Sequence, residues 1–189
     1  VIQIVSGENR LHCKVMRLSK INLSFLIIFL VLLIDQVVKV WIKTHFMLGE
    51  EVHVFGNWFI IHFIENNGMA FGYDLGGVGG KIALSVFRLI AVCALGYFIH
   101  LMIKRGAPIG FILALGLITA GAAGNIIDSA FYGMIFNDST YANHLIEGSG
   151  VATLFPNEGG YAPFLQGKVV EMLYFPIIRG NWPEWFPIW

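Results

Sequence analysis

The sequence predicts an all-α polytopic membrane protein, a bundle of three membrane spans with a small β-sheet at the membrane surface. The first observation is compositional: 57% of the 189 residues are hydrophobic and only 13% are charged. Such a balance is far from that of a soluble domain. The second observation is three apolar runs, at residues 23–42, 82–103 and 109–127. As helices, these runs are about long enough to cross a hydrocarbon core of roughly 30 Å.

The charge balance limits the expected partners. Lys and Arg number 12, as do Asp and Glu. No net charge is left to attract a polyanion, so nucleic acid is not an expected partner. The two cysteines, Cys13 and Cys93, lie before the first run and inside the second. This spacing predicts neither a disulfide nor a metal site, and no cofactor is expected.

The first apolar run ends in a pair of opposite charges. Residues 1–15 are weakly patterned and precede Met16, so we interpret them as a non-native upstream segment before a domain at 16–189. The run at 23–42 is too long for most cleaved signal peptides and should stay in the membrane. Asp35 and Lys39 are four residues apart and can share one helix face. They belong either to a polar site or to a simple ion pair at the helix end.

Residues 50–66 change to a β pattern. They are rich in β-branched and aromatic residues around the Gly56-Asn57 interruption, which favours two short strands lying on the membrane surface. The segment 65–72 follows with turn chemistry. Its Asn66 is a candidate site residue, and a surface turn without a function is the alternative.

Basic residues set the expected topology. Lys104 and Arg105 close the second run, and Arg17 and Lys20 precede the first. The positive-inside rule then places the N-terminus in the cytoplasm and exports the segments 43–81 and 128–189.

The third run ends in Asn125 and Asp128, three residues apart and hence on one helical face. Polar groups at the end of a membrane span are expensive and are functional by default, although a helix end wetted by water is the alternative. The topology brings them to the same membrane face as Asp35 and Asn66. The sequence therefore predicts a site at the outer boundary of the bilayer, accessible to lipid and water.

A loop rich in Gly, Asn, Ser, Thr and Pro runs to about residue 167 and contains no further span. The apolar stretch 167–176 then holds one carboxylate, Glu171, between Val170 and Met172. Glu171 is a candidate general acid, and an exposed strand residue is the alternative.

Five stretches occur in an order and spacing that resemble the lipoprotein signal peptidases (signal peptidase II). They are 34–39, 65–72, 120–128, the Gly-rich loop and 167–172. The long loop, and Ser129 after Asp128, resemble the Bacteroidetes-type branch of that family.

The resemblance implies a four-span bundle with a small periplasmic β-sheet in the bacterial inner membrane. The implied activity is that of an intramembrane aspartic endopeptidase, which removes signal peptides from lipid-modified prolipoproteins before the diacylglyceryl cysteine. The implied partners are these precursors and membrane lipid, without a metal or cofactor. The residues that match the family's site-shaping and substrate-binding motifs are Asp35, Lys39, Asn66, Gly68, Asn125 and Asp128.

Glu171 stands where the resemblance places the first catalytic Asp, in a Val-Val-Asp motif. The second belongs to a Phe-Asn-x-Ala-Asp motif that is expected after Trp189. We therefore expect the chain as given to be C-terminally incomplete, with three of four spans, and inactive. The alternatives are a noncatalytic membrane subunit that binds lipid or protein, and a small membrane carrier. A carrier usually shows broken helices or internal repeats, which this sequence lacks.

Overall fold

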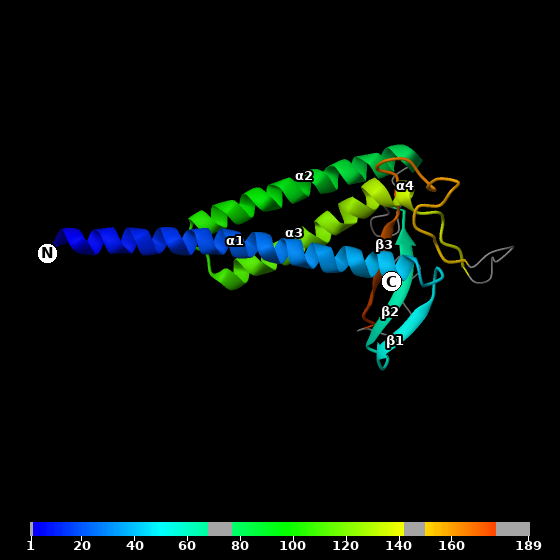
Figure 1. Ribbon diagram of the computed structural model, residues 1–189, viewed down its shortest axis with the longest axis horizontal. Helices are drawn as coiled ribbons and strands as arrows, with labels where there is room; N and C mark the ends of the chain where they lie inside the picture. The colour runs from blue at the N-terminus through cyan, green and yellow to red at the C-terminus, as the bar shows by residue number, and fades with distance from the viewer. Residues whose placement is uncertain (1, 68–76, 142–149, 177–189) are drawn as a thin grey trace, which may run out of the picture. The chain divides into compact units, whose positions relative to one another are not determined.

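Three long helices and a three-stranded sheet make up the described part of the chain. The computed structural model describes residues 2–67, 77–141 and 150–176, with side chains described from Lys20 onward. The elements follow in the order α1 (Ile2–Lys43), β1 (Glu51–Phe55), β2 (Phe59–Asn66), α2 (Gly77–Lys104), α3 (Ile109–Ile127), the π-helical turn η1 (Asp128–Tyr132), α4 (Gly133–Ile135) and β3 (Val169–Tyr174) (Figure 1).

The three predicted spans are confirmed as long apolar helices. The segments able to cross a membrane are Lys20–Lys43, Gly77–Lys104 and Ile109–Ile135. The third continues beyond the predicted end at residue 127, through η1 and α4. Helical backbone therefore continues past Asn125 and Asp128, whose side chains bind partners inside the protein, as shown below. α1 begins at Ile2 and so includes the residues interpreted as an upstream segment.

The chain divides into two compact units, each described here by itself. The first comprises the described residues of Val1–Asp35 and Arg88–Gly124, and the second those of Gln36–Phe87 and Asn125–Trp189.

The first unit is a helical bundle with an isoleucine core. Ile99, Ile103 and Ile112 are buried, and Ile21, Ile28 and Leu115 pack against them. A Cβ added at Gly116 would lie 3.5 Å from Ile28 Cγ1, so the helices approach closely there, as small residues allow in membrane bundles. Lys20 Nζ donates to the carbonyl of Ala107 at 2.9 Å and fastens α1 to the turn between α2 and α3.

The second unit contains an antiparallel sheet in the order β1-β2-β3. The predicted pair of strands in residues 50–66 is confirmed, and Figure 1 shows β3 beside β2 as the third. Across β2 and β3, Asn66 faces Val169 and Ile64 faces Glu171. Glu171 is therefore a strand residue, but it is half-buried and not exposed as the alternative interpretation had it.

The core of the second unit joins the end of α1 to η1 and the sheet. Its buried side chains are Ile42, Phe46, Phe63, Tyr132, Phe136, Ala152 and Val170. Residues from the end of α1, from η1 and from the sheet thus share one hydrophobic cluster.

The long loop packs back onto η1 through backbone contacts. Gly167 N donates to Ser129 O at 2.9 Å, Leu165 N to Ala130 O at 3.3 Å and Ala162 N to Gly133 O at 2.9 Å. These bonds satisfy carbonyls around the π-helical turn. A Cβ added at Gly167 would strike the carbonyl oxygen of Asp128, so the glycine is what lets β3 begin this close to η1.

Candidate active site

The side chain of Asp128 is the centre of the polar cluster. It opens η1 and is 0% exposed. Lys39 Nζ lies 2.6 Å from Oδ2, Gln36 Nε2 donates to Oδ1 at 3.1 Å, and the backbone N–H of Val170 donates to Oδ2 at 3.2 Å. A buried charge persists only when it is paired and hydrogen-bonded. Asp128 meets this condition and joins α1, η1 and β3.

Lys39 serves both polar residues at the end of the third span. Its Nζ also donates to Asn125 Oδ1 at 3.0 Å, and its side chain is only 4% exposed. The prediction that Asn125 and Asp128 share a face is therefore confirmed by a common partner. These two partners of Lys39 come from the end of the third span. Asp35 itself is half-buried on α1 and belongs to the first unit.

Glu171 receives a hydrogen bond from the neighbouring strand. Asn66 Nδ2 donates to Glu171 Oε1 at 2.9 Å. The two residues are diagonal neighbours across the β2–β3 pair, a spacing that long side chains bridge. Glu171 is half-buried, so its carboxylate is positioned by Asn66 and still reachable from outside.

One peptide unit connects the two parts of the site. Val170, whose N–H binds Asp128, directly precedes Glu171 on β3. The buried ion pair therefore fixes the backbone of β3 next to the Glu171 carboxylate. Gly68, the remaining predicted site residue, lies outside the described residues.

Sequence reasoning missed a second ionic cluster beside the first. Lys43, which is 0% exposed, forms an ion pair with Glu65 Oε1 and donates to Ser139 Oγ at 2.9 Å. Lys168 Nζ lies 3.4 Å from Glu65 Oε2 and 2.6 Å from Asp138 Oδ1.

Part of the two clusters had a sequence signal. Gln36, Lys39 and Lys43 follow the spacing of one helical face, so the pattern that placed Lys39 could also have placed the other two. Ser139 and Lys168 come from loop segments, for which no local periodicity exists.

Burial and charge shift the pKa of Lys168, a member of this cluster, and of Tyr161 beside it. Both residues lie outside the spans. Burial alone would lower the pKa of Lys168, but its hydrogen bond to Asp138 and the charge of Glu65 outweigh burial and raise that pKa above the ordinary 10.5. Burial raises the pKa of Tyr161 above its ordinary 10.0. The Tyr161 hydroxyl accepts the backbone N–H of Lys168 at 2.7 Å.

Among the residues that the structure describes, no group of three or more His, Cys, Asp or Glu side chains is arranged to hold a metal ion. The site consists of carboxylates, amides and ammonium groups.

The fold and site together define a polytopic helical membrane protein with a carboxylate-bearing site where α1 and η1 meet a small sheet. The sequence matches the model of the family described as "Signal peptidase (SPase) II" over residues 27–189. The chain belongs to the signal peptidase II family, a family of aspartic proteases. The predicted family resemblance is thereby confirmed.

Relatives and solved structures agree with this assignment. The chain is 46% identical over 167 residues to the lipoprotein signal peptidase of Porphyromonas gingivalis, covering 86% of this chain and 67% of that protein. It is 32% identical over 161 residues to that of Amoebophilus asiaticus, covering 84% and 61%.

A solved bacterial membrane enzyme is similar with a TM-score of 0.52 and 25% identity, covering 86% of this chain and 80% of that one. A second has a TM-score of 0.51 and 24% identity, covering 86% and 76%, and supports the fold alone. The predicted fold class is confirmed.

Proposed function

We propose that the protein formed by this chain and the family's fourth span removes signal peptides from lipid-modified prolipoproteins by cleaving before the diacylglyceryl cysteine. In this proposal Glu171 supplies one of the two reacting carboxylates. The observation that carries the proposal is the Asn66–Glu171 hydrogen bond at 2.9 Å, next to a backbone unit held by buried Asp128. We further propose that the protein lies in the bacterial inner membrane with its N-terminus in the cytoplasm.

An aspartic protease divides its chemistry between two acids. The ionised carboxylate takes a proton from a water molecule as that water attacks the scissile carbonyl, and the protonated partner supports the carbonyl oxygen and later protonates the leaving amine. In the proposal Glu171 is one member of this pair. Like charges in close proximity cannot both ionise, which keeps one proton on the pair.

Asp128 does not fit the second role. Both of its oxygens already accept hydrogen bonds, and Lys39 holds one of them at 2.6 Å. A carboxylate fixed in this way cannot exchange protons with a substrate without breaking the cluster that positions β3. We therefore propose that Asp128, Lys39 and Asn125 are positioning residues, and that the second acid is the one the family resemblance places after residue 189.

Asn66 has a different proposed role. Its amide donates to Glu171 and fixes the direction in which the carboxylate points. A carboxylate held in position should react faster than a mobile one, because a misplacement of about 1 Å can lower the reaction rate about a hundredfold. Asp35 and Gly68 remain proposed substrate-binding residues.

Exchange of one atom at Glu171 tests the proposal. In a chain extended by the family's fourth span, Glu171→Gln preserves the shape and the acceptor for Asn66 but removes the acid. Cleavage of a purified diacylglyceryl-modified prolipoprotein should fall by about a hundredfold or more, the usual contribution of a general acid or base.

The matched control is Glu158→Gln, which makes the same exchange at an exposed loop carboxylate of the same unit. It should cleave at the parent rate. If Glu171→Gln also cleaved at the parent rate, the carboxylate would have no part in the reaction and a noncatalytic role would replace the proposal.

A further inference from the structure

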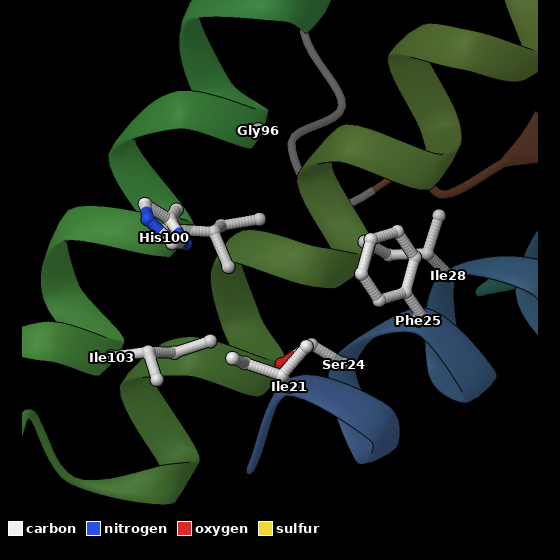
Figure 2. A pocket seen from close by; sticks show the side chains of 8 residues that line it. Ile21, Ser24, Phe25, Ile28, Gly96, His100 and Ile103 are labelled. Carbon is white, nitrogen blue, oxygen red and sulfur yellow. The ribbon is translucent and has the colours of Figure 1, made fainter. Parts of the chain in front are cut away.

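A small cavity lies in the helical unit. None of the residues that line it belongs to the carboxylate cluster. Its volume is about 120 Å³, below the roughly 300–1,000 Å³ of sites that enclose a whole small molecule. Its apolar wall comes from two helices, with Ile21, Phe25 and Ile28 on α1 and Gly96, Ile99 and Ile103 on α2. Figure 2 shows the labelled side chains of the two helices facing the space between them. The cavity therefore fits part of one flexible apolar chain.

Two polar side chains also line the cavity. Ser24 is 4% exposed, and its hydroxyl donates to the carbonyl of Lys20 at 2.7 Å. His100 lies on α2 between Ile99 and Ile103 and is exposed (Figure 2). An imidazole beside an apolar wall offers a hydrogen bond to an ester or phosphate oxygen that a purely apolar groove lacks.

Basic residues adjoin the cavity along both helices. Lys20 directly precedes Ile21, and the exposed Lys104 and Arg105 directly follow Ile103. The lining residues belong to segments long and apolar enough to span a membrane, and Lys20 and Lys104 stand at the ends of these segments. In a bilayer these basic residues would lie toward one interface. Basic pockets between spans at that interface attract anionic headgroups.

We propose that this cavity is a binding site for one anionic phospholipid, with an acyl chain against Gly96 and the headgroup phosphate at Lys104 and Arg105. The acyl chain gains no hydrophobic driving force here, because the surrounding lipid is equally apolar. It instead fills a space whose lining atoms would otherwise lack contact partners. Selectivity comes from the headgroup charge. The site is independent of the proposed peptidase reaction and uses none of its residues.

Native mass spectrometry of the delipidated chain in detergent tests the site. Phosphatidylglycerol and phosphatidylcholine with identical acyl chains are offered at equal concentration. One phosphatidylglycerol should remain bound in clear preference over phosphatidylcholine. Neutralising the exposed charges in Lys104→Gln and Arg105→Gln should reduce the preference about fivefold for each charge. Equal retention of the two lipids by the parent chain would overturn the proposal.

The cavity itself is tested by Gly96→Leu. A Cβ at Gly96 meets no atom within 4 Å, so the larger side chain has room to occupy the place of the acyl chain. Gly110→Leu is the matched control, since its added Cβ also meets nothing within 4 Å and it lies on α3 outside the cavity. Phosphatidylglycerol retention should fall only in Gly96→Leu. Equal retention in both variants would refute the site.

The salt dependence of lipid binding tests the site on the unchanged chain. This test remains valid even if Gly96→Leu fails to fold. Raising the ionic strength from about 0.01 M to 1 M shortens the Debye length from about 30 Å to 3 Å. Because the proposed selectivity is electrostatic, the preference for phosphatidylglycerol should fall steeply with salt. A preference independent of salt would contradict the assignment of the headgroup to the basic residues.

Discussion

Lys39 Nζ lies 2.6 Å from Asp128 Oδ2, and neither side chain is more than 4% exposed. This contact holds the end of a membrane span against the first residue of a π-helical turn, and the same carboxylate accepts the N–H of Val170 on β3. A single buried charge pair therefore connects two membrane helices to the strand that carries Glu171.

Removal of the ammonium group should destabilise the fold. Lys39→Met leaves Asp128 buried without its cation, which costs about 3–5 kcal/mol when one partner of a buried pair is lost. Lys104→Met is the control at an exposed position of α2 and should change the free energy of unfolding by less than about 0.5 kcal/mol. Thermal unfolding in detergent, followed by circular dichroism, measures both. Similar losses in the two variants would mean that the pair contributes little.

Shortening Glu171 should raise activity in a chain that carries the family's fourth span. Asp retracts the carboxylate by a methylene, on the order of 1 Å, toward the position that the family's aspartate occupies, and the cleavage rate should rise about tenfold to a hundredfold. If the backbone has instead adjusted to Glu, Asp would stand too far from its partner and the rate would fall. Equal rates with Glu, Asp and Ala would show that position 171 has no catalytic role.

A methyl group at Gly167 should disrupt the contact between the loop and η1. The added Cβ would strike the carbonyl oxygen of Asp128, a backbone atom that cannot rotate away. Gly167→Ala should therefore lower the free energy of unfolding by about 1–3 kcal/mol, as overpacking does. Gly79→Ala is the control, because its Cβ meets nothing within 4 Å and it lies in a helix where Ala is favoured. A harmless Gly167→Ala would contradict the close approach.

The free energy of unfolding should fall at alkaline pH. Unfolded Tyr161 and Lys168 release their protons near the ordinary values of 10.0 and 10.5, whereas the folded groups have raised pKa values and keep them. The unfolded state then binds fewer protons, so the stabilisation is complete below about pH 10 and is lost as the pH rises through the folded pKa values.

Tyr161→Phe separates the contribution of the Tyr161 phenol to this pH dependence from that of Lys168. The variant loses the bond to the N–H of Lys168 and should be less stable at every pH, but its free energy of unfolding should fall less between pH 9 and pH 11 than that of the parent. Denaturation at the two pH values measures the difference. Parallel curves for parent and variant would rule out a raised pKa at Tyr161.

Cysteine labelling tests the proposed topology. In a background with Cys13 and Cys93 replaced by Ser, a cysteine at the exposed position of Glu158 should react with an impermeant reagent in intact cells. A cysteine at Arg105 should react only after permeabilisation, because the positive-inside rule places Lys104 and Arg105 on the cytoplasmic side. The reverse pattern would invert the membrane orientation.

The sequence by itself predicted the spans and the polar face of the third. Span length and apolar content are local properties, so residues 23–42, 82–103 and 109–127 could be read without knowing their neighbours. The spacing of Asn125 and Asp128 is equally local, since helical periodicity alone puts them on one face. The motif order likewise predicted the family.

Tertiary structure decided which partners these groups have. Asn66 reaches Glu171 across 105 residues, and Lys39 reaches Asp128 across 89. No local pattern specifies such a register, because it depends on how β3 pairs with β2 and on how the loop packs against η1. The cluster of Lys43, Glu65, Ser139 and Lys168 was missed for the same reason: burial makes the charges pair, and burial exists only in the folded chain.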